Sequence, residues 1–158
     1  MKENFFVRLD DRLVHGQVTQ GWLPYLKAEE IIVVSKDILE DPFQKKIISL
    51  AVPLGVSITF TSVEQLPLIL QNLKKKAIVI FNDFHSLIQF INNYPVKDIN
   101  LSNYHPKNAV LLDRNFWLTE EELKEIDNCS KDTNFYIQTV PTDKPVNLIS
   151  AIEKWQKI

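Results

Sequence analysis

The run Ile31-Ile32-Val33-Val34-Ser35 is apolar along nearly its whole length, and Ala77-Ile78-Val79-Ile80-Phe81 is apolar throughout. Short continuous runs of this kind are typical of parallel strands that helices cover on both faces. The same pattern predicts further strands at residues 5–9, 56–60, 98–101 and 134–140.

Segments of helical period lie between these runs. Asp41-Pro42-Phe43-Gln44 combines a capping aspartate, a proline at the first helical position and a glutamine at the third. Thr119-Glu120-Glu121-Glu122 is a second capping box, with acids at the favourable end of the helix dipole. After the first of these starts, one helix face is expected to carry Phe43, Ile47, Leu50 and Ala51.

Alternating β and α segments predict an α/β fold with three layers, α/β/α. We expect an open, mostly parallel sheet of about six or seven strands, with helices on both faces and one domain spanning residues 1–158. The segment 103–118 fits this alternation least well, and we expect it to be irregular.

Composition excludes several classes of protein. The 158 residues are 45% hydrophobic and 24% charged, which is ordinary for a globular domain. A net charge of −2 gives no general attraction to nucleic acid, and the single cysteine rules out an internal disulfide. No apolar run approaches the ~20 residues of a membrane span, and the first residues do not resemble a signal peptide. We therefore expect a cytoplasmic protein.

Glycine occurs only three times, at Gly16, Gly21 and Gly55. Neither common glycine-rich phosphate loop is present, so a flavodoxin-like or other nucleotide-binding function lacks support. If phosphate chemistry occurs in this chain, other groups must hold the phosphate.

The densest polar cluster, Arg8 to Gln17, follows the first predicted strand. Ligands of open α/β sheets bind beyond the carboxyl ends of strands, where this loop is expected. His15 precedes a predicted helix from Gly16 to about Leu23, and backbone N–H groups at a helix start favour an anion.

These residue types suit a phosphoryl acceptor. Positive charge from Arg12 and Arg8 favours the neutral, nucleophilic imidazole of His15 and complements phosphoryl oxygens. Asp10 or Asp11 could accept the proton of the other ring nitrogen and fix the tautomer. The alternative from spacing alone is a loop histidine bonded to the backbone, beside surface ion pairs worth about 0–1 kcal/mol.

Arg8-Leu9-Asp10-Asp11-Arg12-Leu13-Val14-His15-Gly16-Gln17-Val18, followed by Gly21-Trp22 and residues 31–35, resembles the IIB component of the bacterial phosphotransferase system, mannose/fructose/sorbose family. The pattern is long and specific. The resemblance continues through residues 41–53 to Asn100 and to Val140-Pro141-Thr142-Asp143, and so extends over essentially the whole chain.

The resemblance implies that His15 accepts a phosphoryl group from a phosphorylated IIA protein. It would pass the group to a hexose-type sugar that crosses the membrane through the IIC and IID components, with which the protein would associate peripherally. Arg12 and Asp10 would belong to the same active loop, and Arg8, Gly16 and Gln17 would support the phosphoryl group. No cofactor, metal or nucleic acid is implied, and homodimer formation stays open.

Two departures from the family pattern motivate an alternative, a non-catalytic regulatory or binding protein with the same fold. Family members usually carry a glycine-containing stretch where this chain has Ser102-Asn103-Tyr104-His105, and many carry an arginine where it has Gln138. Pro24 also falls inside the first predicted helix, where it is expected to end or kink that helix.

His85 and His105 are the other histidines. With His15 and Asp83 they could in principle form a metal site, but no pair has a recognised ligand spacing. Asn82 or Asp83 is expected to cap the helix that follows. Because Phe81-Asn82 ends a parallel strand, these two residues could also line the pocket of His15.

Overall fold

Parallel pairing joins most strands into one sheet. In a computed structural model that describes residues 4–129 and 131–158, seven strands lie in the order β3-β2-β4-β1-β5-β8-β9. All neighbours pair in parallel except β8 and β9, which are antiparallel. The strands of this sheet are β1 (Phe5–Leu9), β2 (Glu30–Val34), β3 (Ser57–Thr61), β4 (Ala77–Phe81), β5 (Asp98–Leu101), β8 (Asn134–Ile137) and β9 (Val146–Asn147).

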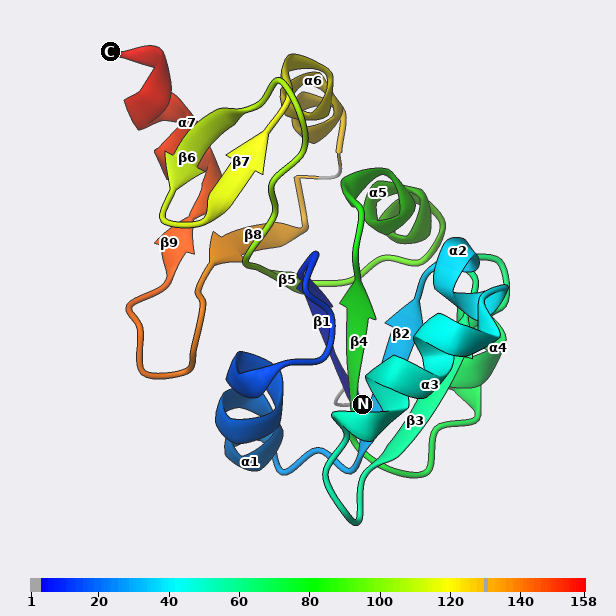
Figure 1. The fold of residues 1–158 in the computed structure, drawn as a ribbon. Coiled ribbons are helices and arrows are strands. Elements are labelled where there is room, and N and C mark those ends of the chain that lie inside the picture. Colours follow the sequence, from blue (N-terminus) through cyan, green and yellow to red (C-terminus); the bar gives the residue numbers. More distant parts are fainter. Residues whose placement is uncertain (1–3, 130) are drawn as a thin grey trace.

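Helices cover both faces of this sheet (Figure 1), which confirms the predicted α/β/α class. The helices are η1 (Gln17–Trp22), α1 (Leu23–Leu26), α2 (Lys36–Leu39), α3 (Pro42–Leu50), α4 (Leu66–Gln71), α5 (Phe84–Asn93), α6 (Glu120–Asp127) and α7 (Leu148–Gln156). Residues of η1, α1, α2 and α3 pack on one face, and residues of α4 to α7 pack on the other.

Side chains of the central strand β4 alternate between these two cores. Ile78 and Ile80 point to the face of η1 and α3, whereas Val79 and Phe81 point to the face of α4 and α5. All of them are fully buried. Burial on both faces is the reason why the strand reads as a continuous apolar run rather than an alternating one.

The structure shifts several predicted strand limits. β2 starts at Glu30 and ends at Val34, because the side chain of Ser35 caps α2 by accepting a hydrogen bond from Ile38 N. β3 lies one residue later than predicted. The last predicted strand, 134–140, ends at Ile137, and the chain then returns through a turn to form β9.

The expectation of an irregular segment at 103–118 is wrong for its second half. Val110–Asp113 (β6) and Phe116–Leu118 (β7) form an antiparallel hairpin with an irregular register. Arg114 in the connecting turn has a left-handed φ of 47°, which lets the strands fold back within few residues. The hairpin lies beside α7 (Figure 1) and buries Phe116 and Leu118 in the core.

The helix after the first loop has two parts. It begins as the π-helix η1, in which the N–H of Leu23 donates to the carbonyl of Val18, and it continues as α1 with Pro24 in its first turn. It ends at Leu26, because Lys27 adopts a left-handed conformation. The helix changes from π to α geometry just before Pro24. This proline has no backbone N–H to donate to the preceding turn, so a change in the hydrogen-bond pattern is expected at this point.

The apolar stripe predicted for α3 does not face the sheet. Phe43 is 69% exposed and Leu50 is 80% exposed, whereas Ile48 and Val52 pack against the core. The capping prediction is confirmed, since the Asp41 carboxylate accepts hydrogen bonds from the backbone at the helix start.

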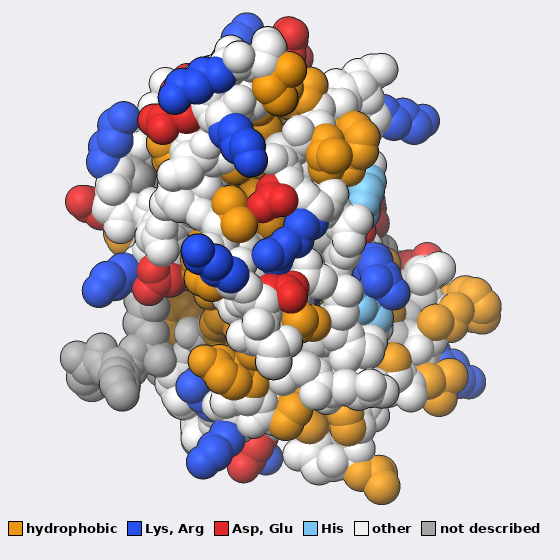
Figure 2. Space-filling view, turned by 90° about the vertical axis from the view of Figure 1, so that its left-hand side faces the viewer, with side chains coloured by type: hydrophobic (Ala, Val, Ile, Leu, Met, Phe, Trp, Pro, Cys, Tyr) orange, Lys and Arg blue, Asp and Glu red, His pale blue; other side chains and the backbone are white. Residues whose placement is uncertain are grey.

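The surface charges and the helix lengths show whether the protein has features of nucleic-acid binding or of membrane insertion. Basic and acidic side chains are intermixed on the face in Figure 2, with hydrophobic side chains between them, so that face has no basic stripe of the kind that follows a nucleic-acid backbone. Among residues 4–129 and 131–158, no helix is long and apolar enough to cross a membrane.

Candidate active site

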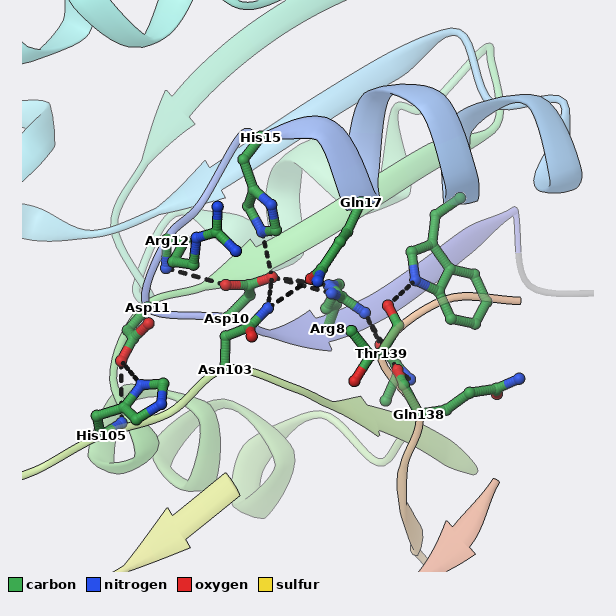
Figure 3. Close-up of polar contacts among 12 residues, drawn as sticks. Arg8, Asp10, Asp11, Arg12, His15, Gln17, Asn103, His105, Gln138 and Thr139 are labelled. Atoms are coloured by element: carbon green, nitrogen blue, oxygen red, sulfur yellow. Dashed lines mark hydrogen bonds and ion pairs between the residues drawn. The ribbon is translucent and has the colours of Figure 1, made fainter. Parts of the chain in front are cut away.

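The polar cluster of the sequence forms a tight loop at the carboxyl end of β1, in the middle of the sheet. The N–H of Asp10 still donates to the carbonyl of Phe81 on β4, at 2.9 Å. A turn follows, closed by the N–H of Leu13 donating to the carbonyl of Asp10 at 3.1 Å. Leu13 has a left-handed φ of 56°, and burial of its side chain holds this unfavourable conformation in place. The turn brings His15 back above Asp10 (Figure 3).

The Asp10 carboxylate is the centre of the site. Its Oδ2 atom accepts hydrogen bonds from Arg8 Nη2 at 2.9 Å and Nε at 3.2 Å, and from Asn103 Nδ2 at 3.2 Å. It also lies 2.7 Å from His15 Nε2. The other oxygen, Oδ1, accepts from the backbone N–H of Arg12 at 2.9 Å. A fully buried carboxylate is thereby surrounded by donors.

Arg8 is an arginine in the middle of a strand, with a fully buried side chain. In register with Asn100 on β5, it donates from Nη1 to Asn100 Oδ1 at 2.6 Å and to the carbonyl of Gln138 at 3.4 Å. Its guanidinium lies 5.7 Å from the ring centre of Trp22, within cation–π range. Charge pairing, hydrogen bonds and the aromatic ring together offset the cost of burying this cation.

The electrostatics favour an ionised Asp10. Burial by itself raises the pKa of this carboxyl, but the hydrogen bond with His15 and the charge of Arg8 bring its pKa below the ordinary 3.8. Burial lowers the pKa of Arg8, an effect that Asp10 opposes. An arginine stays protonated at neutral pH even so. The site therefore contains a buried carboxylate–guanidinium pair, and His15 is hydrogen-bonded to its carboxylate.

The two ring nitrogens of His15 have different surroundings. Because Asp10 is ionised, it can only accept, so Nε2 must carry the proton that it shares with Oδ2. Nδ1 is covered and has no hydrogen-bond partner among the described residues. In the neutral ring this tautomer leaves the lone pair on Nδ1. The side chain is 11% exposed, so the ring lies at the surface edge of the site.

A groove of about 530 Å³ has Gly16 and Gln17, the two residues after His15, among its lining residues. Gly16 and Gly21 line one side, and the turn that contains Pro141 lines the other. The Trp22 Nε1–H donates to the carbonyl of Thr139 at 2.9 Å and so fixes the turn against η1. A larger hollow, of about 610 Å³, is lined by the first residues of β1, β5 and β8 and includes no residue of the loop 10–17.

The structure brings together most of the predicted site residues. Arg8, Asp10 and His15 are in direct contact, and Asp10 rather than Asp11 pairs with His15. Arg12 contributes a backbone N–H to Asp10, and its side chain is exposed. Gly16 immediately precedes η1.

The pocket prediction for Phe81 is wrong. Its side chain is fully buried among other apolar residues, since it faces the core of α4 and α5, and only its carbonyl reaches the loop. Asn82 is half-buried, and a role for it stays a prediction. Asp83 is the residue that caps α5, through Ser86 N at 2.8 Å.

The other histidines are not part of this centre. His105 contacts Asp11, whereas His85 lies in the first turn of α5. Among the described residues, no group of three or more histidine, cysteine, aspartate or glutamate side chains could hold a metal ion.

Two asparagines were not predicted from the sequence to have a role in the site. Asn100 Oδ1 accepts from Arg8, and Asn103 donates to Asp10 and to Gln17 Oε1. Asn100 is at the carboxyl end of a parallel strand, which is a position where site residues are expected. Asn103 lies beyond the strand, in a segment for which the sequence offered no structure.

The side chain of Gln138 is bonded to the turn after β8 and not to the loop 10–17. Its Nε2 donates to the carbonyls of Pro141, at 3.2 Å, and Asp143, at 2.9 Å. The side chain therefore holds the turn after β8, while its own carbonyl accepts from Arg8 and Asn100.

Solved structures define the class of this fold. The chain superposes with a TM-score of 0.84 on manxB from Thermoanaerobacter tengcongensis, with 22% identity over 98% of this chain and 99% of that one. It superposes with a TM-score of 0.85 on the IIBSor domain of the sorbose permease from Klebsiella pneumoniae, with 21% identity over 94% and 95% of the two chains. The fold is thus that of IIB domains of sugar permeases.

Sequence relatives cover the chain from end to end. The fructose-specific EIIB component of the phosphotransferase system (PTS) of Bacillus subtilis is 24% identical over 95% of this chain and 96% of its own length. The N-acetylgalactosamine-specific IIB component 2 of Escherichia coli is 24% identical over 92% and 96%. The family model of the PTS system sorbose subfamily IIB component matches residues 4–158, so this chain belongs to that family.

Proposed function

We propose that the protein is a phosphoryl carrier in which His15 is the transient phosphohistidine. The observation that carries this proposal is the asymmetry of the imidazole ring. Nε2 is engaged by the buried Asp10, and Nδ1 has no partner in the part of the chain that the structure describes. A fixed tautomer with a lone pair on Nδ1 is what a nucleophilic ring nitrogen needs.

The acceptor step forms one bond and breaks one. The Nδ1 lone pair attacks the phosphorus of a donor phosphohistidine, and the donor's N–P bond breaks, with its electron pair returning to the donor ring. In the second step a sugar hydroxyl oxygen attacks the same phosphorus, and the His15 N–P bond breaks. The hydroxyl proton leaves to solvent or to a base of the acceptor.

Positive charge and positioning supply the catalysis. Phosphoryl transfer needs little covalent work from the protein beyond alignment and stabilisation of charge on the equatorial oxygens. Arg12 belongs to the same loop as His15 and has an exposed guanidinium that can reach the phosphoryl group, whereas Arg8 acts through Asp10 rather than by touching it. Because Nδ1 is covered in the free protein, the docking partner has to uncover it.

Partners follow from the proposed reaction. A phosphorylated IIA protein would be the donor, and a hexose-type sugar carried by membrane IIC and IID components would be the acceptor. A mannose-specific EIIAB component of Escherichia coli is 40% identical over 50 residues, and its name joins A and B units in one protein. The protein would then work in the cytoplasm at the membrane surface. The named sugars of the relatives differ, so they do not select one.

The test is phosphate uptake. The protein is incubated with phosphoenolpyruvate, the general carrier proteins and its own IIA partner, and its intact mass is measured. We expect an acid-labile, base-stable gain of one phosphate in the wild type and no gain in His15→Ala. His105→Ala is the matched control and should gain phosphate normally. Equal labelling of His15→Ala would overturn the assignment.

A regulatory or binding protein without transfer activity is the second candidate. It is favoured by Gln138, which replaces an arginine of the family pattern and uses its side chain on the turn rather than on the site. Absence of phosphate gain in the wild type, with a competent IIA partner, would support this candidate.

A further inference from the structure

Asn103 occupies an unusual backbone position next to the active loop. It lies just after the end of β5, it is 2% exposed, and its φ is +39°. The left-handed region is unfavourable for most side chains, with asparagine among the better tolerated. Glycine would fit this turn without strain, so the backbone alone does not require an amide side chain here.

The amide of Asn103 bridges two parts of the loop. Nδ2 is 3.2 Å from Asp10 Oδ2 and 2.6 Å from Gln17 Oε1 (Figure 3). The orientation of the amide follows from chemistry, because the opposite choice would direct its oxygen at an ionised carboxylate. The carbonyl of Asn103 also accepts from the N–H of Asp11 at 2.9 Å.

The two side-chain contacts of Asn103 are with one residue before His15 in the sequence, Asp10, and one residue after it, Gln17. Asp10 determines which ring nitrogen carries the proton, and Gln17 is the first residue of η1, two positions after His15. A neutral donor holds the carboxylate without cancelling its charge, so Asp10 keeps its ability to bind Nε2–H. Asn103 does not touch the reacting nitrogen.

We propose that Asn103 is a positioning residue for His15, because its amide holds Asp10 and the start of η1 in the arrangement that leaves the lone pair on Nδ1. The effect on transfer rests on the proposed function. The effect on the tautomer does not, because it concerns the free protein alone.

Asn103→Gly is the decisive variant, since it removes the amide and keeps a residue suited to the positive φ. We expect its melting temperature to fall by no more than about 4 °C. Its rate of phosphorylation by the IIA donor should drop about ten-fold or more, since the loss of one hydrogen bond to a charged group corresponds to at least that factor. The ¹⁵N resonances of the His15 ring should move toward each other, because both tautomers become populated.

Asn134→Ala is the matched control. Its amide also donates to a carboxylate, Asp98 Oδ1 at 3.1 Å, but it does so at the opposite end of the same sheet. This variant should keep the wild-type rate and the wild-type ring resonances. Wild-type resonances and rate in Asn103→Gly would overturn the inference. If the wild type takes up no phosphate, the proposed function fails, and the ring resonances still decide the role of Asn103.

Discussion

Asp10 and Asp11 are neighbours in the sequence, and each contacts a histidine (Figure 3). The first pair, Asp10 with His15 at 2.7 Å, has side-chain exposures of 0% and 11%. The second, Asp11 with His105 at 3.1 Å, has exposures of 30% and 48%. The same two residue types therefore form a buried centre and a surface contact at two adjacent aspartates of one loop, the second with a histidine from beyond β5.

The two pairs differ in that only Asp10 also has a buried arginine, Arg8, as a partner among the described residues. Arg8 points its buried guanidinium at Asp10 and keeps that carboxylate charged inside the protein. Asp11 instead accepts from the backbone N–H and the Nδ1 atom of His105 at the surface, where water screens the interaction. The comparison teaches that burying an aspartate–histidine pair requires a buried counter-charge, which sequence spacing alone does not reveal.

Breaking the buried pair should have the largest effect. In Asp10→Asn the guanidinium of Arg8 stays buried without its counter-ion, so we expect a loss of about 3–5 kcal/mol of unfolding free energy. Asp11→Asn is the control and should lose no more than about 1 kcal/mol. Urea unfolding of the two variants measures this. Equal losses would contradict the contrast between the pairs.

Acidification should reduce the difference in stability between wild type and Asp10→Asn. Since the pKa of Asp10 lies below its ordinary 3.8 in the folded state, its stabilising charge is fully present above that value. The contribution is lost as the pH falls through the folded pKa. The gap in unfolding free energy between wild type and Asp10→Asn should therefore be constant near neutral pH and narrow below about pH 4. A gap that widens there would contradict the direction of the shift.

Arg12→Gln tests the exposed cation beside the buried pair. Its side chain is exposed, so we expect the unfolding free energy to change by less than about 0.5 kcal/mol. Transfer from the IIA donor should slow on the order of ten-fold or more, because a cation facing the phosphoryl oxygens is lost. Rapid-quench measurement of phosphate uptake gives the rate, and an unchanged rate would remove Arg12 from the proposed site.

His105→Gln should have the smallest effect. The backbone N–H of His105 still reaches Asp11 in this variant, and only the contact from Nδ1 is lost. We expect stability within about 0.5 kcal/mol of wild type and a transfer rate within about two-fold. A large loss of rate would show that the second pair takes part in the reaction.

The sequence predicted the parallel strands of the sheet and the loop that contains the candidate site. Continuous apolar runs identify strands such as Ala77–Phe81 because burial on both faces leaves no polar positions. The loop after β1 is dense in charge, and Arg8, Asp10 and His15 are near one another in sequence as well as in space. The spacing of these residues within a short segment is therefore enough to predict that their side chains lie close together.

Contacts made over long distances in the chain were not predictable. Asn103 reaches Asp10 across 93 positions, and no local pattern marks it. The β6–β7 hairpin depends on a left-handed Arg114, a residue type that rarely indicates a turn. The apolar stripe predicted for α3 was expected to be buried, but it is exposed to solvent. A helical period shows that one face of a helix is apolar, and it does not show that another element covers that face.

The position of β1 has a consequence for synthesis. The first strand of the chain lies in the middle of the sheet, between β4 and β5, and its arginine bonds to Asn100, 92 positions later. During synthesis, β1 therefore has no strand to pair with until β4 and then β5 have left the ribosome. A nascent chain truncated before β5 would contain His15 and Asp10 but lack Asn100 and Asn103, so the hydrogen-bond network around Asp10 is complete only after these later residues are synthesised.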